Sequence, residues 1–202
     1  MPIADKYSGM DLRILESATE LFSSHGYKGT TTREIAQLAM VSENSVFRHF
    51  QNKEGLFWAV LESRFSRINM RHELRESLRS HKSWDVVLPM LLEYLTYIVV
   101  YQHGLIRLLC VAFLELPEKA EVLCGLYISP IFVDVSHYLA KSSGKNELSA
   151  FESTLLAAAF VGSPIVHPLY HKLVSGSEPI SLPEVKERVR LYTAFWLSVL
   201  NK

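Results

Sequence analysis

Cysteine is scarce in this chain of 202 residues, which contains only Cys110 and Cys124. Both stand in apolar stretches, and neither belongs to a Cys-x-x-Cys or Cys/His ligand pattern. The sequence therefore offers no disulfide framework and no zinc site built on cysteine. We expect two buried, reduced thiols in a cytosolic protein.

Motifs of the common enzyme classes are also missing. The sequence has no nucleophile elbow, P-loop, glycine-rich dinucleotide motif or HExxH. His167 and His171 are four residues apart, as metal ligands on one helical face can be, but no third ligand has a known position. We therefore expect no enzyme, no metal site and no cofactor. An enzyme that uses a His/Glu/Asp cluster inside a helical body stays open as an alternative.

No apolar run is long enough to span a membrane. The most apolar stretch, residues 88–116, is interrupted by Glu93, Gln102, His103 and Arg107 well before the about 20 residues that a membrane helix needs. The first residues lack the apolar region of a signal peptide. Because 49% of the residues are hydrophobic, we expect a folded, cytoplasmic protein with a real core.

The chain has no excess of either charge, since its net charge is +0. On its own this argues against a nucleic-acid partner. The distribution is uneven, however, because residues 26–75 hold eight Lys or Arg but only five Glu. This local positive excess favours an N-terminal segment that binds anions.

Alternation typical of strands is absent, and helical periodicity runs along almost the whole chain. The pattern predicts an all-α fold, with Pro130 and Pro164 kinking or locally breaking their helices. Gly26 is a natural left-handed C-cap, Thr31 and Glu34 form a capping box, and Ser42 is a further N-cap. The expected helices are 11–24, 32–40, 43–49, 53–79, 84–101, 104–116, 118–141, 147–173 and 183–201.

Two short helices joined by three or four residues, with the small Ala36 at their crossing, are typical of a helix-turn-helix. The first helix braces the second, whose N-terminal residues reach base edges in the major groove. We expect a helix-turn-helix DNA-binding domain over residues 1–55 and a helical ligand-binding and dimerisation domain over 56–202. A long helix over about 53–79 would connect them. We assign Ile35, Phe50 and Leu56 to the core of the N-terminal domain.

Three segments in order, GYKGTTTREIA at 26–36, VSENSVFRHF at 41–50 and NKEGL at 52–56, resemble the TetR family of bacterial repressors. The resemblance covers about residues 11–60. It implies a transcriptional regulator that responds to a small-molecule effector and binds double-stranded DNA as a homodimer. The residues that it implies at the DNA are Thr31, Arg33, Ser42, Glu43, Asn44, Ser45, Phe47, Arg48, His49 and Lys53.

The sequence departs from the family pattern at several of these positions. Met40 stands where the turn usually has glycine, and Asn44 where the recognition helix often has glycine. Phe47 replaces a common tyrosine and so lacks a hydroxyl donor to phosphate. Gly55 replaces a frequent acidic residue. Glu43 would repel phosphate unless it accepts a hydrogen bond from cytosine or points away.

The C-terminal helices offer a dimer face, because a short recognition helix covers few base pairs and a two-fold dimer on a palindrome is expected. Small and apolar residues recur along helices 147–173 and 183–201, which could form a four-helix interface like that of the resembled family. The alternative is that they complete the core of one chain. The expected dimerisation residues are Leu155, Ala158, Ala159, Gly162, Val189, Tyr192 and Trp196.

A pocket for the effector is expected from the resemblance alone, among helices 84–141 where aromatic side chains mix with polar insertions such as Glu115. The candidate residues are Tyr94, Tyr97, His103, Arg107, Tyr127 and His137. A helical protein-interaction module with weak or lost DNA binding is the alternative to a regulator.

Overall fold

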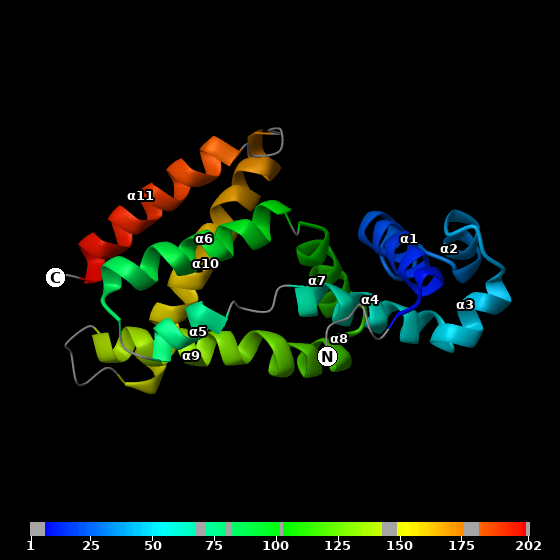
Figure 1. The fold of residues 1–202 in the computed structure, drawn as a ribbon, viewed down its shortest axis with the longest axis horizontal. Coiled ribbons are helices and arrows are strands. Elements are labelled where there is room, and N and C mark those ends of the chain that lie inside the picture. The colour runs from blue at the N-terminus through cyan, green and yellow to red at the C-terminus, as the bar shows by residue number, and fades with distance from the viewer. Residues whose placement is uncertain are drawn as a thin grey trace. The chain divides into compact units, whose positions relative to one another are not determined.

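The computed structural model describes residues 7–67, 72–79, 82–101, 103–142, 149–175 and 182–200. These residues form helices and short connections, with no strand among them, so the all-α class is confirmed (Figure 1). The helices are α1 (Gly9–His25), α2 (Thr32–Leu38), α3 (Glu43–Phe50), α4 (Lys53–Arg67), α5 (His72–Arg79), α6 (Trp84–Tyr101), α7 (His103–Glu115), α8 (Pro117–Leu123), the π-helical η2 (Cys124–Ile128), α9 (Ser129–Ser142), α10 (Ala150–Ser175) and α11 (Leu182–Leu200).

The chain divides into two compact units. The first, which we call the head unit, comprises Met1–Asn69 and His103–Cys124, and the second, the body unit, comprises Met70–Gln102 and Gly125–Lys202. This division differs from the predicted boundary at residues 55 and 56, because α7 packs on α1 and α4 and so adds to the head. The expected long helix is described as α4 and α5, and the residues between them lie outside the described part.

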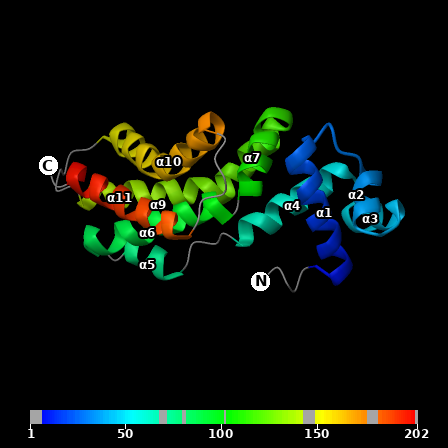
Figure 2. The same ribbon diagram turned by 90° about the horizontal axis from the view of Figure 1, so that it is seen from above.

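The head unit is built around α1, which crosses and packs against α4 (Figure 2). Ile14, Ala18 and Phe22 of α1 are fully buried, and Phe22 meets the ring of Phe57 on α4 edge-on at 5.0 Å between centroids. The predicted core residues Ile35, Phe50 and Leu56 are buried, which confirms their assignment. The apolar stripe of each short helix therefore faces one shared core.

The body unit has α6 at its centre, packed against both α10 and α11, while α9 packs against α10 and α5. Leu88 and Leu92 of α6, Tyr138 of α9 and Phe160 of α10 belong to one buried cluster. The hydroxyl of Tyr138 donates to the carbonyl of Lys82 at 2.8 Å, so its polar end is satisfied at the edge of the core.

Three local predictions had different outcomes. Cys110 is exposed and Cys124 half-buried, so the expectation of two buried thiols was wrong, because Cys110 lies on the outer side of α7. The break expected at Pro130 is confirmed by η2, a π-helical turn just before it. Pro164 sits inside α10 without ending it. By length and composition alone, Pro117–Lys141 could cross a membrane, contrary to the expectation that no apolar run is long enough, and 22% of its most apolar window is buried.

Candidate DNA-binding site

The turn between α2 and α3 depends on an unusual backbone conformation at Met40. The N–H of Val41 donates to the carbonyl of Ala36 at 3.0 Å, and the N–H of Met40 donates to the carbonyl of Gln37 at 3.2 Å. This pair of bonds is the Schellman arrangement, in which the residue after the C-cap, here Met40, adopts the left-handed conformation. Met40 has a φ of 55°, and 89% of it is exposed. The turn therefore holds a strained residue whose side chain contributes little packing.

Replacing Met40 with glycine is expected to raise the free energy of unfolding by about 0.5–1 kcal/mol, because glycine adopts a positive φ without the steric cost of a Cβ. Urea denaturation of the full chain measures this change. Met40→Ala is the matched control, since it removes the exposed side chain but keeps the Cβ, and it should leave the midpoint nearly unchanged. A glycine variant no more stable than the alanine variant would contradict the assignment of strain.

Helix α3 presents one face to the core and the other to solvent. Ser42 caps it, with its hydroxyl accepting the backbone N–H of Ser45 at 3.1 Å, as the sequence predicts. Val46 and Phe50 are buried. The outward face carries the side chains of Asn44, Phe47 and Arg48, all exposed. This face is the surface that a recognition helix would offer to the major groove.

Two exposed arginines lie at this surface, Arg48 on the outward face of α3 and Arg33 on α2. Within the described ranges neither makes a hydrogen bond or an ion pair. Their guanidinium groups are therefore free to bind an anion such as a phosphate.

Two other predicted contact residues stabilise α2. The hydroxyl of Thr31 accepts the N–H of Glu34 at 3.2 Å, and the carboxylate of Glu34 accepts the N–H of Thr31 at 2.8 Å, so the capping box is confirmed. Glu43 accepts a hydrogen bond from the hydroxyl of Thr32 at 2.6 Å. Its carboxylate thus links the start of α3 to α2, which answers the concern that it would face the DNA unpaired.

Lys53, predicted to contact a phosphate, is directed to the loop before α2. Its Nζ donates to the carbonyls of Tyr27 and Thr30, both at 3.0 Å, and lies 4.3 Å from the centroid of the Tyr27 ring. An ammonium group has three N–H donors, so one remains for a phosphate. The phosphate contact stays a prediction, while the role in holding the loop comes from the structure.

Glu115 holds the same loop from another side, and sequence reasoning missed it. Its carboxylate accepts the backbone N–H of Tyr27 at 3.2 Å and that of Lys28 at 2.7 Å. Gly26, which ends α1 with the predicted positive φ of 77°, leaves room for this approach, because a Cβ there would lie 2.8 Å from Oε1 of Glu115. The sequence pattern groups Glu115 with the polar residues near an effector pocket, and nothing local in the sequence indicates a contact 88 residues away.

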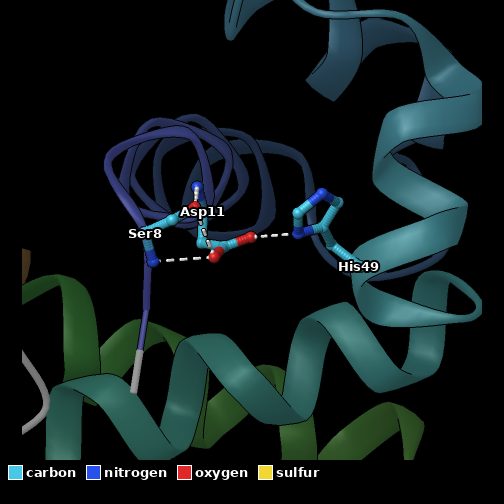
Figure 3. A network of polar contacts seen from close by, with 3 residues as sticks. All are labelled: Ser8, Asp11 and His49. Atoms are coloured by element: carbon cyan, nitrogen blue, oxygen red, sulfur yellow. Dashed lines mark hydrogen bonds and ion pairs between the residues drawn. The ribbon is translucent and has the colours of Figure 1, made fainter. Parts of the chain in front are cut away.

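His49 was expected on the flank of the duplex, and it pairs with Asp11 of α1. Its Nδ1 lies 2.6 Å from Oδ1 of Asp11 (Figure 3). Burial raises the pKa of the Asp11 carboxyl, but hydrogen bonds from Ser8 and the charge and hydrogen bond of His49 outweigh burial, and the net pKa is lowered. Asp11 is therefore an ionised anchor for the last turn of α3.

The predicted pocket residues differ in their exposure, and their role in binding an effector stays a prediction. Tyr97, Arg107 and His137 are exposed, because each lies on the outer side of its helix, and Tyr127 is half-buried. The side chain of His103 lies outside the described part. Tyr94 is largely enclosed, and burial raises its pKa to about 12 against the opposing charge of Arg75. Among the described residues, no group of three or more His, Cys, Asp or Glu is placed to hold a metal.

The predicted dimerisation residues separate into two groups. Trp196 is buried in the core of its own chain, where it meets Phe160 and its indole N–H donates to Ser163 at 3.1 Å. Val189 and Tyr192 are half-buried against the same core, and a contact of any of these three residues with a second copy stays a prediction. Gly162 is half-buried. The predicted residues that lie exposed are Leu155, Ala158 and Ala159 on α10. Exposed apolar side chains outside the prediction are Leu191, Phe195 and Val199 on α11.

Residues 14–60 match the family model described as "Bacterial regulatory proteins, tetR family". Over 54 residues the chain is 50% identical to "Uncharacterized HTH-type transcriptional regulator YvkB" of Bacillus subtilis, an alignment that covers 27% of this chain and 29% of that protein. The chain thus matches less than a third of the length of this relative, and the similarity in sequence concerns the head.

Solved structures share the fold over nearly the whole chain. AibR in complex with isovaleryl coenzyme A and operator DNA superposes with a TM-score of 0.67 at 15% identity, covering 92% of this chain and 97% of that one. FadR from Bacillus subtilis in complex with stearoyl-CoA gives a TM-score of 0.64 at 14% identity, covering 91% of this chain and 95% of the other. At such identities the likeness concerns the arrangement of helices alone.

Proposed function

Because residues 14–60 carry the N-terminal domain of the tetR family of bacterial regulatory proteins, we propose that the chain is a sequence-specific DNA-binding regulator that acts in the cytoplasm. The observation that carries this proposal is the outward face of α3, where Asn44 and Arg48 are exposed beside the free guanidinium of Arg33. A capped helix with amide and guanidinium groups on one face suits hydrogen bonds to base edges and phosphates. Asn44 and Ser45 would read bases, while Arg33 and Arg48 would bind the backbone.

The regulator would act as a homodimer on a palindromic operator. One α3 helix of eight residues covers only a few base pairs, so useful specificity needs a second copy one helical turn away. The exposed apolar residues of α10 and α11 support a second copy of this chain as the occupant of that face. Isolated apolar side chains on a surface are ordinary, but several on two neighbouring helices are typical of an interface.

We further propose that a small-molecule effector binds the body unit and that the protein is a repressor released by it. The structural neighbours AibR and FadR were solved with acyl-coenzyme A ligands, which makes acyl thioesters the first class to test. Tyr94, enclosed beside Arg75, offers a hydroxyl and a nearby positive charge inside the body unit.

The decisive test is a selection of genomic DNA fragments with the purified full chain, followed by a salt titration on the best duplex. A palindromic motif bound by two chains, with affinity falling steeply as salt rises, is the expected result. Arg33→Ala and Arg48→Ala should each weaken binding about tenfold. Lys82→Ala, which removes an exposed charge from the body unit, is the matched control and should bind like the unsubstituted protein. No enriched sequence would favour the interaction-module alternative.

A further inference from the structure

Two arginines of α5 share one carboxylate of α9. Helix α5 packs against both α6 and α9 within the body unit (Figure 1). Nε of Arg75 lies 3.9 Å from Oδ2 of Asp134, and Nη2 of Arg79 lies 3.7 Å from Oδ1. Because the two arginines are four residues apart, their side chains leave the same face of the helix. We call Arg75, Arg79 and Asp134 the arginine cluster.

Neither contact in the arginine cluster is a hydrogen bond. Both N···O distances exceed the about 3.2 Å of a well-formed N–H···O bond. A structural pair of arginine and carboxylate is usually joined by two parallel bonds of about 2.7–2.9 Å. Nε of Arg75 is buried and has no hydrogen-bond partner, which is costly for a polar donor. Toward the described residues, the two guanidinium groups thus keep donors that Asp134 does not use.

The arginine cluster carries one positive charge in excess, because two guanidinium groups face one carboxylate. Glu76 on α5 and Glu93 on α6 are exposed, and within the described part of the chain neither forms an ion pair with these arginines. The side chains of Arg75 and Arg79 are 39% and 60% exposed, against 18% for Asp134. An anion that arrives from solvent therefore reaches the guanidinium groups more readily than it meets the carboxylate.

Apolar side chains adjoin the arginine cluster. Tyr94 on α6 is largely enclosed, and burial raises its pKa to about 12 although the nearby charge of Arg75 acts to lower it. Met90 lies one helical turn before Tyr94, and Ile131 lies about one turn before Asp134 on α9. Both are half-buried and pack against the core of the body unit. A ligand with a negative end and an apolar chain therefore suits these surroundings.

We propose that the arginine cluster binds the carboxylate of an aliphatic acid, with Arg75 and Arg79 as the donors. Planar guanidinium groups can each donate two parallel hydrogen bonds to a carboxylate. The single excess charge suits a monoanion better than a phosphate monoester, which carries about −1.5 to −2 at neutral pH. Asp134 sets this preference by cancelling one of the two positive charges. The inference rests on the proposed function only in making this acid the effector.

The test is isothermal titration calorimetry of the full chain without DNA, using straight-chain carboxylates from acetate to dodecanoate at neutral pH. Affinity should rise with chain length, because each added methylene buries more apolar surface. The alcohol with the chain of the best acid should bind at least tenfold more weakly, since it brings no charge to the guanidinium groups. Added salt should weaken binding of the acid and leave that of the alcohol unchanged.

Variants of the arginine cluster should change the preference for the acid. Arg79→Gln should weaken the acid about tenfold, the size of one hydrogen bond to a charged group, and leave the alcohol unchanged. Because Arg79 is 60% exposed, this variant should keep its fold even if Arg75→Gln does not. Asp134→Asn should tighten binding of the matching alkyl phosphate more than that of the acid, because the charge that repels a dianion is gone. Arg190→Gln, which removes an exposed arginine of α11, is the matched control and should bind the acid normally.

The proposal would be overturned if no acid of the series binds, if acid and alcohol bind equally, or if the alkyl phosphate binds more tightly than the acid. An Arg79→Gln variant with undiminished affinity for the acid would also overturn it. A coenzyme A thioester that binds while the acid does not would overturn the arginine cluster as the site but keep the effector class of the proposed function.

Adding the best acid to the complex with operator DNA separates the site from its role. We expect the acid to release the DNA from the unsubstituted protein and not from Arg79→Gln at the same concentration. An acid that binds through Arg79 without releasing DNA would keep the site and contradict the effector role. A protein that binds the acid but no duplex would overturn the proposed function and leave the arginine cluster in place.

Discussion

Replacing Glu115 with alanine is expected to destabilise the loop between α1 and α2 by about 2 kcal/mol, because two backbone N–H groups lose a charged acceptor. Glu115 accepts from Tyr27 and Lys28, while Lys53 binds the carbonyls of the same loop. The negative carboxylate of Glu115 therefore binds N–H groups of the loop, and the positive ammonium group of Lys53 binds its carbonyl groups. Without Glu115, the partly buried N–H of Tyr27 loses this acceptor.

The consequence should reach the DNA, because this loop leads directly into the N-cap of α2. Thr30 donates its hydroxyl to the carbonyl of Gly26 at 2.8 Å, and Thr31 caps the helix. A loosened loop changes how firmly α2 braces α3. We expect operator affinity to fall several-fold in Glu115→Ala.

Hydrogen exchange at the amides of Tyr27 and Lys28 measures the effect directly. A loss of about 2 kcal/mol corresponds to exchange about thirtyfold faster at these two positions. Glu115→Gln keeps one acceptor oxygen and should show an intermediate rate. Glu121→Ala removes an exposed carboxylate from α8 and serves as the matched control. Unchanged exchange at both amides in Glu115→Ala would show that the clamp does not form in solution.

Helix ends in the head were predictable because their causes are local. Thr31 and Glu34 are three residues apart, and Ser42 precedes the recognition helix by one, so the caps follow from the sequence alone. The same holds for the buried positions of Ile35 and Phe50, which recur at helical spacing. Helix caps and apolar stripes can therefore be predicted without knowing how the helices pack against one another.

Contacts between distant elements were not predictable. Glu115 meets a loop far away in the sequence, and His49 meets Asp11 on another helix. The choice between the two faces of α11 was not predictable for a related reason. This helix has two apolar stripes, and the one through Trp196 turns inward because α6 and α10 pack against it. Periodicity shows that a stripe exists, while only tertiary packing decides which stripe the chain buries itself.

Replacing Phe195 with glutamate is expected to separate the proposed dimer into single chains and to weaken operator binding at least a hundredfold. Phe195 is 57% exposed on α11, next to Leu191 at 52% on the same face. Burial of an aromatic side chain stabilises an interface strongly, whereas a buried carboxylate without a partner is costly. The two-fold symmetry of a homodimer repeats the substitution on both sides. Each separate chain then binds its half-site alone, without the high effective concentration of the second chain that a dimer provides.

Sedimentation gives the mass, and anisotropy gives the affinity on the same samples. The unsubstituted protein should have about twice the mass of one chain of 23.0 kDa, and Phe195→Glu should have the mass of one chain with unchanged helical content. Leu114→Glu places the same charge on an exposed apolar position of α7, 82% exposed, and should remain a dimer. If Phe195→Glu keeps the dimer mass, another surface joins the copies. If the unsubstituted protein already has the mass of one chain and still binds the palindrome tightly, the two copies meet only on DNA, and the outer face of α11 loses its proposed role.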